Sequence, residues 1–158
     1  MRTGSHRNYW DAHVADAELL ARSEGFRDLR DRLIDHAHPR PEHTVLDLGS
    51  GTGLVALSIA PQVDTVWAMD ISPAMCDYLR TKAESAGHDN IKVAVASAVS
   101  LPLVEHSVDV VISNYCLHHL RDSDKRRAAL EAMRVLRPGG KLVIGDMMFR
   151  VSIGDARD

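Results

Sequence analysis

The chain is poor in cysteine, in aromatic residues and in excess charge of one sign. Two cysteines among 158 residues exclude a disulfide scaffold, and Cys76 and Cys116 are expected to be buried thiols of a reducing compartment. Only 4% of the residues are aromatic. The 19 basic and 22 acidic side chains give a net charge of −3, which creates no field to gather a polyanion and disfavours nucleic acid as a partner.

Long apolar runs are also missing. No stretch approaches the length needed to span a membrane, and residues 1–10 have no apolar core for a signal peptide. These two absences predict a cytoplasmic protein that has no membrane partner. The composition, 45% hydrophobic and 26% charged, is typical of a soluble globular protein, and 158 residues fit a single domain.

The most informative stretch, residues 45–53, joins a strand to a helix through a turn that contains three glycines. Val45, Leu46 and Leu48 form the short apolar run of a strand covered on both faces in a parallel sheet, and residues 54–60 continue with a helical pattern. Glycine lets a ligand approach the main chain closely, and the helix offers unpaired amides at its start. We therefore predict a cofactor-binding turn.

The spacing of these glycines distinguishes two classes of cofactor. Gly49, Gly51 and Gly53 follow the pattern G-x-G-x-G, whereas the dinucleotide fingerprint is G-x-G-x-x-G, which counts against an NAD-dependent oxidoreductase. Asp47, two residues before the first glycine, would repel a pyrophosphate. It would attract an ammonium group, directly or through one water, and the methionyl end of S-adenosylmethionine carries such a group.

With Asp47 ahead of its glycines, the turn resembles the first motif, D-x-G-x-G-x-G, of class I S-adenosylmethionine-dependent methyltransferases. The resemblance extends from about Val45 to Met147 and is greatest to small-molecule enzymes of the ubiquinone and menaquinone biosynthesis type. It implies an α/β fold with a doubly wound, Rossmann-like parallel sheet of strand order 3-2-1-4-5. It also implies that S-adenosylmethionine, or the product S-adenosylhomocysteine, binds over the turn that includes Ser50.

Apolar patterns predict the other elements of this sheet. Strands are expected at residues 65–70, 91–95, 108–112 and 141–147. Two helices separated by Gly25 form an N-terminal cap over residues 1–40, and residues 44–148 form the core. Ser72 and Pro73 begin one later helix, and Ser123 caps another. The apolar side of that last helix is predicted to comprise Ala129, Leu130, Met133 and Leu136.

Several residues are candidates for contacts with the cofactor. Asp70, followed by Ile71, ends the second strand, where an acidic side chain accepts hydrogen bonds from ribose hydroxyls. The family's usual acid after the third strand is replaced by Ser97 and Ala98, so adenine is expected to bind the Ser97 hydroxyl or the backbone. Tyr9 is a candidate ring near the sulfonium, and packing of the helix on the core is the alternative for it.

The segment after the fourth strand supplies the catalytic candidates. The resemblance implies that Asn114 lines the methyl-transfer site, and the prolines of the amine-methylating motif are absent. His118 and His119 are adjacent, so they should point in different directions and at most one should reach the substrate. A neutral imidazole there would remove a proton; the alternative is packing or helix-end bonding. Together with Cys116 they lack the second ligand pair of a zinc site, and no metal is expected.

The predicted function is transfer of a methyl group from S-adenosylmethionine to a small-molecule acceptor by in-line displacement. A catalytically silent, methyltransferase-like binding or assembly subunit is the alternative, which Ser97 keeps open. The residues after the fifth strand, 149–158, are too few for the family's C-terminal antiparallel strands. The fifth strand should therefore have an open apolar edge, and we expect a homo-oligomer through this edge, or a missing partner segment, and weak activity in a monomer.

Overall fold

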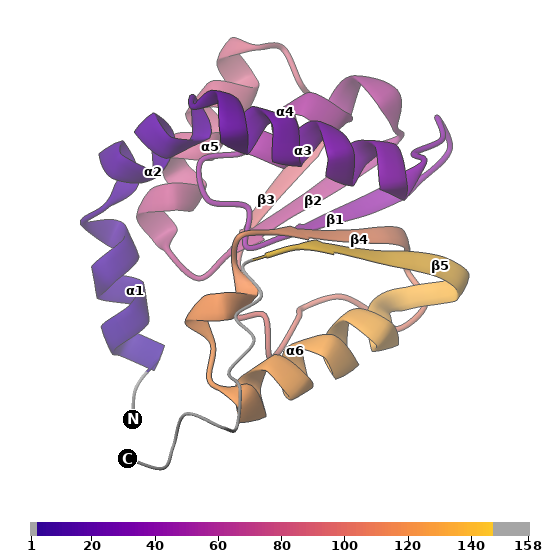
Figure 1. The fold of residues 1–158 in the computed structure, drawn as a ribbon. Coiled ribbons are helices and arrows are strands. Elements are labelled where there is room, and N and C mark those ends of the chain that lie inside the picture. The colour runs from indigo at the N-terminus through magenta and orange to yellow at the C-terminus, as the bar shows by residue number, and fades with distance from the viewer. Residues whose placement is uncertain (1–2, 147–158) are drawn as a thin grey trace, which may run out of the picture.

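A single parallel sheet organises the chain. The computed structural model describes residues 3–146 and has a five-stranded sheet in the order β3-β2-β1-β4-β5 (Figure 1). The strands are β1 (Thr44–Leu48), β2 (Thr65–Asp70), β3 (Ile91–Val95), β4 (Val108–Asn114) and β5 (Leu136–Gly145). Every pairing between these strands is parallel, which confirms the predicted doubly wound, Rossmann-like fold and its strand order.

Helices cover both faces of this sheet. They are α1 (Thr3–Asp11), α2 (Val14–Ala21), α3 (Glu24–Ala37), α4 (Leu54–Ile59), α5 (Pro73–Ser85) and α6 (Asp122–Val135), with 3₁₀ turns η1 (Ala60–Gln62) and η2 (Leu117–His119). In Figure 1, α3, α4 and α5 lie on one face of the sheet and α6 lies on the other. Within residues 3–146, none of the helices has the length and apolar character needed to cross a membrane.

The N-terminal region has three helices where the sequence predicted two. The helical spacing that begins at Trp10 is interrupted because α1 ends at Asp11, and the amides of Ala12 and His13 bond back to the carbonyls of Tyr9 and Trp10. Gly25 does not separate helices, since it lies in the first turn of α3. The periodicity therefore detected apolar faces correctly but not the break between them.

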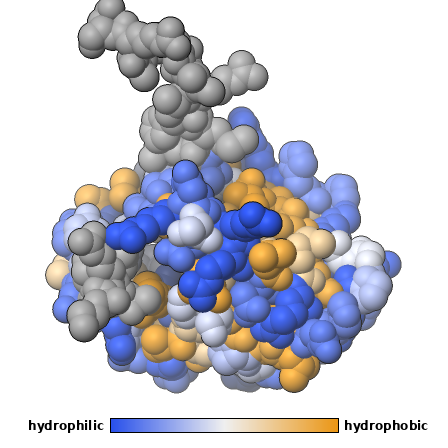
Figure 2. Space-filling view, turned by 90° about the horizontal axis from the view of Figure 1, so that it is seen from below, coloured by the Kyte–Doolittle hydropathy of each residue, from blue (hydrophilic) through white to orange (hydrophobic). Residues whose placement is uncertain are grey.

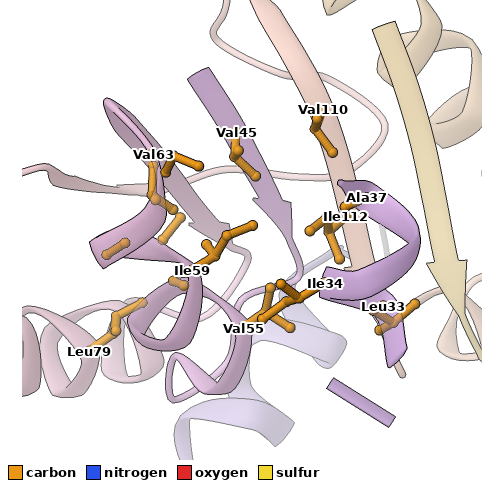
Figure 3. Close-up of a cluster of buried hydrophobic side chains, with 14 residues drawn as sticks. Leu33, Ile34, Ala37, Val45, Val55, Ile59, Val63, Leu79, Val110 and Ile112 are labelled. Atoms are coloured by element: carbon orange, nitrogen blue, oxygen red, sulfur yellow. The ribbon is translucent and has the colours of Figure 1, made fainter. Parts of the chain in front are cut away.

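Two hydrophobic clusters hold the helices on the sheet. On one face, Val45, Val110 and Ile112 from the strands pack with Ile34 of α3 and Val55 of α4 (Figure 3). On the other face, a second cluster includes Leu46, Leu48, Met69, Val111, Ala132 and Val135. Neighbouring β1 residues alternate between the clusters, as the period of a strand requires. Burial of each such side chain stabilises the fold by about 1.5–3 kcal/mol.

The buried face of α6 differs from the predicted one. Ala128, Ala132 and Val135 are buried, whereas Leu130 and Met133 are 63% and 60% exposed. Both sets of residues have helical spacing, and the smaller alanines allow α6 to approach the sheet closely. Apolar side chains consequently reach the surface among polar ones on the face of the molecule that α6 forms (Figure 2). Ser123 is not the cap either, because the helix already begins at Asp122.

Strand β5 begins earlier than predicted. It starts at Leu136, so the Pro138-Gly139-Gly140 segment lies inside the strand, where the register with β4 is irregular. Among the residues that the structure describes, β5 pairs with β4 alone. The predicted strand end at Met147 and residues 149–158 lie outside the described part of the chain.

Candidate active site

The glycine turn lies at the carboxyl edge of the sheet, between β1 and α4. Gly49, Gly51 and Gly53 have φ angles of 77°, 51° and 92°, which only glycine adopts readily. The amides of Gly49 and Ser50 donate to the carbonyl of Met69, at 2.8 and 3.0 Å. The turn is therefore fixed to the end of β2, and its conformation explains why three glycines are present.

The three glycines have different surroundings. A Cβ atom on Gly49 would lie 2.2 Å from the sulfur of Cys116, and one on Gly53 would lie 2.2 Å from a methyl carbon of Leu79. A Cβ atom on Gly51 would meet no atom within 4 Å. Gly49 and Gly53 thus accommodate the protein's own packing, whereas Gly51 leaves the main chain open to a ligand.

Asp47 lies beneath this turn. Its side chain accepts a hydrogen bond from the backbone amide of Ala56 at 2.9 Å, and the residue is only 1% exposed. Burial, assisted by the charge of Asp70, raises the pKa of Asp47 to about 7. Asp47 therefore positions α4 against β1, and its depth leaves room for an effect of its charge, in the ionised form above about pH 7, but not for direct contact.

Asp70 bridges the two turns that flank the site. One of its oxygens accepts from the amide of Gly51 and the other from the amide of Ser72, both at 2.9 Å. Burial raises the pKa of Asp70, although these two hydrogen bonds act in the opposite direction. Each carboxylate oxygen has two acceptor positions, so both oxygens retain capacity for a hydroxyl. Ile71, next in the chain, is half-buried beside it.

Two buried polar atoms near the turn have no partner. Among the described residues, the Ser50 hydroxyl and the Oδ1 atom of Asn114 are the buried side-chain atoms that form no hydrogen bond. A buried polar group without a partner costs about 1–3 kcal/mol. Ser50 follows β1 and Asn114 ends β4, so both lie at the topological switch point, where open α/β sheets bind ligands.

The end of β3 lies beside the same edge. The amide of Ala96 donates to the carbonyl of Asp70 at 2.8 Å, which brings Ser97 and Ala98 close to the end of β2. The Ser97 hydroxyl is 3.5 Å from the amide of Val99, at the limit of a hydrogen bond. Ala98 packs against the second hydrophobic cluster. The Ser97 side chain thus has only a weak contact within its own loop.

Helix α1 is attached to the edge of the site through Asp11. This carboxylate accepts from the Ser72 hydroxyl at 2.5 Å and from the Ala74 amide at 3.1 Å. Trp10 forms an edge contact with His119, with ring centroids 4.8 Å apart. Tyr9 is 53% exposed and stacks on His13. Trp10, and not Tyr9, therefore contacts the segment after β4.

Helix α2 is attached to the glycine turn by a partly buried ion pair. Lys82 of α5 donates to Glu18 at 2.9 Å and to the carbonyl of Thr52 at 3.1 Å. Burial of the Glu18 carboxyl opposes its ionisation, but hydrogen bonds outweigh this effect and lower its pKa. The bond from Lys82 contributes most among them. The roles of Asp11 and Glu18 were not predicted from the sequence, because their partners Ser72 and Lys82 are about sixty residues away and no local pattern reveals these contacts.

The segment after β4 brings both histidines into the site. Nδ1 of His118 is 2.5 Å from one oxygen of Asp146, and the His118 amide donates to the other oxygen at 3.1 Å. The rings of His118 and His119 have centroids 3.8 Å apart. The expectation that the two side chains point in different directions is therefore wrong, because the 3₁₀ turn brings the rings into contact.

Cys116 lies directly under the glycine turn, as its contact with Gly49 shows. Burial raises the pKa of the Cys116 thiol far above its usual value, and the nearby carboxylates of Asp70, Asp146 and Asp47 add to this effect. A thiol that stays protonated is a poor nucleophile and a poor metal ligand. Cys116 is thus a packing residue, although it is half-buried and not fully buried as the sequence predicted.

A separate cavity of about 710 Å³ opens at the opposite edge of the sheet, near the starts of β1 and β4. Part of its charged lining is paired internally, since Arg137 contacts Asp109 at 2.6 Å and Arg40 contacts His43 at 2.8 Å. It contains neither the glycine turn nor an unpartnered buried atom. The carboxyl edge is therefore the better candidate site.

A doubly wound parallel sheet, with a glycine turn after β1 and an acidic residue at the end of β2, defines an α/β domain of the Rossmann-like class. Residues 45–140 match the family described as methyltransferase domain, and the chain belongs to that family. This match begins at the first residue of the resemblance found in the sequence and includes the entire glycine turn.

Individual relatives agree with this assignment. The chain is 34% identical over 114 residues to YcgJ of Bacillus subtilis, an uncharacterized methyltransferase, with 72% of this chain and 44% of that protein covered. The YcgJ crystal structure gives a TM-score of 0.72 at 32% identity, over 75% of this chain and 50% of that one. The 27-O-demethylrifamycin SV methyltransferase of Amycolatopsis mediterranei is 34% identical over 145 residues, which are 90% of this chain and 51% of that protein.

A protein with a different activity has a similar fold. The crystal structure of SpnF, a 4+2 cyclase, gives a TM-score of 0.75 at 26% identity, with 82% of this chain and 48% of that one covered. The present chain thus spans about half the length of these relatives. Family and fold alone do not define the reaction, which has to be argued from the site.

Proposed function

We propose that this chain binds S-adenosylmethionine at the glycine turn and transfers its methyl group to a small-molecule acceptor. The observation that carries the proposal is the open main chain at Gly51, which is held by Asp70 and flanked by the unpartnered Ser50 hydroxyl and Asn114 oxygen. Buried polar atoms without partners in a member of a methyltransferase family are expected to bond a ligand.

The residues present fit this ligand. Asp70 would accept hydrogen bonds from the two ribose hydroxyls, and the charge of Asp47 would favour an ammonium group over the turn. Ser50 and the glycine amides would contact the methionyl part. Adenine would lie against Ile71, with Ser97 and Ala98 at its edge. Tyr9 and Asn114 complete the proposed set, Tyr9 from the cap and Asn114 from the end of β4.

The chemistry required of the protein is limited. When bound, S-adenosylmethionine supplies a methyl group that its sulfonium has already activated. The chain's own residues then need to hold the acceptor in line with that group and exclude water. Asn114 would orient the acceptor. Trp10 of α1 contacts the segment after β4, where the cap would limit access of water.

The cofactor assignment is tested by the variant Asp70→Ala. Hydrogen bonds to a charged group are worth about 1.5–3 kcal/mol, so the variant should bind S-adenosylhomocysteine ~10- to 100-fold more weakly in calorimetry. Asp89→Ala, which removes an exposed carboxylate outside the site, is the matched control. A melting temperature for each variant separates loss of binding from loss of folding. Equal affinity in wild type and Asp70→Ala would remove the ribose assignment.

The second candidate function is a catalytically silent binding or assembly subunit. It is favoured by the serine at position 97, where the family has an acid, and by the different activity of SpnF on the same fold. Binding of S-adenosylhomocysteine without methyl transfer to any acceptor class would support this function. Stronger binding of NAD than of S-adenosylhomocysteine would instead favour an oxidoreductase.

A further inference from the structure

A continuous series of rings crosses the site at the carboxyl edge of the sheet. In spatial order it comprises Phe26, Tyr115, His118, His119, Trp10, Tyr9 and His13, with successive centroids 3.8 to 5.1 Å apart. The chain has only two tryptophans, three tyrosines and two phenylalanines, and four of these seven are in the series. In a chain so poor in aromatic residues, this concentration marks a surface suited to a flat ligand, because stacked or edge-on ring pairs add about 0.5–1.5 kcal/mol each.

His118, the third ring of this series, is held by a carboxylate. Asp146 contacts its Nδ1 atom at 2.5 Å and its backbone amide at 3.1 Å, and the two side chains are 16% and 10% exposed. A carboxylate only accepts hydrogen bonds, so it assigns the proton to Nδ1 and leaves the Nε2 lone pair as a base. Asp146 is a positioning residue in this arrangement.

We propose that the acceptor is a hydroxyl group on a planar aromatic ring, and that His118, oriented by Asp146, removes its proton. This inference rests on the proposed methyl transfer and specifies its substrate class. The hydroxyl proton passes to Nε2 of His118, and an oxygen electron pair forms the new bond to the methyl carbon. The bond between sulfur and that carbon breaks with its electron pair retained by sulfur, and His118 later returns the proton to water.

The acidity of the acceptor selects this class. An aromatic hydroxyl resembles the tyrosine side chain, whose pKa is about 10, and an unperturbed imidazole has a pKa of about 6.5, so proton transfer between them is within reach. The pKa of an aliphatic hydroxyl is close to that of water and lies far above that of a phenol, so imidazole does not deprotonate it usefully. An aromatic amine is neutral near pH 7, already carries a free electron pair and would give the His118–Asp146 pair no task. An alkylammonium group has a pKa near that of the phenol but offers no flat ring to the series of rings.

The experiment uses 4-nitrophenol, whose yellow phenolate is optically distinct from the phenol. The 158-residue chain, saturated with S-adenosylhomocysteine, is titrated with this probe at pH 6. Wild type should bind the probe with a larger phenolate fraction than the free probe has at that pH. His118→Gln should bind the probe without this increase, and Asp146→Asn should lower the ratio of phenolate to phenol by about 10-fold or more. His36→Gln, an exposed histidine on α3, is the matched control and should behave as wild type.

A competition step tests the planar ring. Phenol should displace the probe, and cyclohexanol at the same concentration should not. The inference is overturned if wild type binds no probe, if His118→Gln keeps the phenolate increase, or if cyclohexanol competes as well as phenol. Failure to bind S-adenosylhomocysteine in the same sample would instead overturn the proposed function. If Asp146→Asn does not fold, the His118→Gln comparison still decides the role of the base.

Discussion

At the scale of single residues, Asp47 is a carboxyl group whose ionisation opposes folding. Burial raises its pKa from 3.8 to about 7, so between these values the folded chain retains a proton that the unfolded chain has released. Stability therefore falls as the pH rises through this window, by up to about 4 kcal/mol. Asp47→Asn keeps an oxygen to accept from the Ala56 amide and removes the charge.

We therefore expect Asp47→Asn to melt at least about 3 °C above wild type at pH 8, with a much smaller difference at pH 4. Scanning calorimetry at the two pH values makes the comparison. Asp64→Asn, at an exposed carboxylate, should leave both melting temperatures near those of wild type. A loss of stability in Asp47→Asn at pH 8 would show that the ionised carboxylate is needed for folding.

The glycines of the turn allow a second comparison between single residues. Gly51→Ala should cost only about 1–2 kcal/mol of stability, because its Cβ atom meets no neighbour and only the left-handed backbone is strained. It should still weaken S-adenosylhomocysteine binding, since the new methyl group occupies the ligand's approach. Gly49→Ala adds an overlap with Cys116 and should lose about 2–4 kcal/mol. Both variants should be compared by urea unfolding and by calorimetric binding. If Gly51→Ala binds S-adenosylhomocysteine as tightly as wild type, the main chain at Gly51 is not the ligand's approach.

At the scale of elements, the attachment of α2 depends on one lysine. Lys82→Met removes the donor to both Glu18 and the Thr52 carbonyl. Within residues 3–146, the Glu18 carboxylate, whose side chain is only 12% exposed, then keeps Arg22 as its one ion-pair partner. The expected loss is about 1–3 kcal/mol in urea unfolding. Arg80→Met, which breaks an exposed pair with Asp77, should cost less than about 1 kcal/mol. Equal losses would mean that the partly buried pair does not hold the cap.

The helices and strands differ in how well the sequence predicted them. The strands and α5 were predictable because each has a strong local signal, such as the Ser72 cap, which accepts from the Met75 amide at 3.1 Å. The buried face of α6 was not, because two stripes one residue apart have the same period and only contact with the sheet selects between them. The turn was identified from Asp47 and its glycines, whereas the contact of Asp146 with His118 joins residues that are distant in the chain.

At the scale of the whole molecule, we propose that copies of the chain associate through the open side of β5. Within residues 3–146 this strand pairs with β4 alone, and Ile144 is 45% exposed. An unpaired apolar edge favours association. Light scattering should give a mass above that of a monomer, and Ile144→Lys should shift the mass toward the monomer. Lys92→Ala on β3, at the other edge, is the control. A monomeric wild type with unprotected β5 amides would exclude the association.

A crystal structure of the chain with S-adenosylhomocysteine would show whether this cofactor binds over the glycine turn. We expect ribose hydroxyls within about 3.2 Å of the Asp70 oxygens, and a ligand partner for the Ser50 hydroxyl or for Oδ1 of Asn114. Ligand density in the cavity at the opposite edge of the sheet, or over the turn without contact to Asp70, would contradict this expectation.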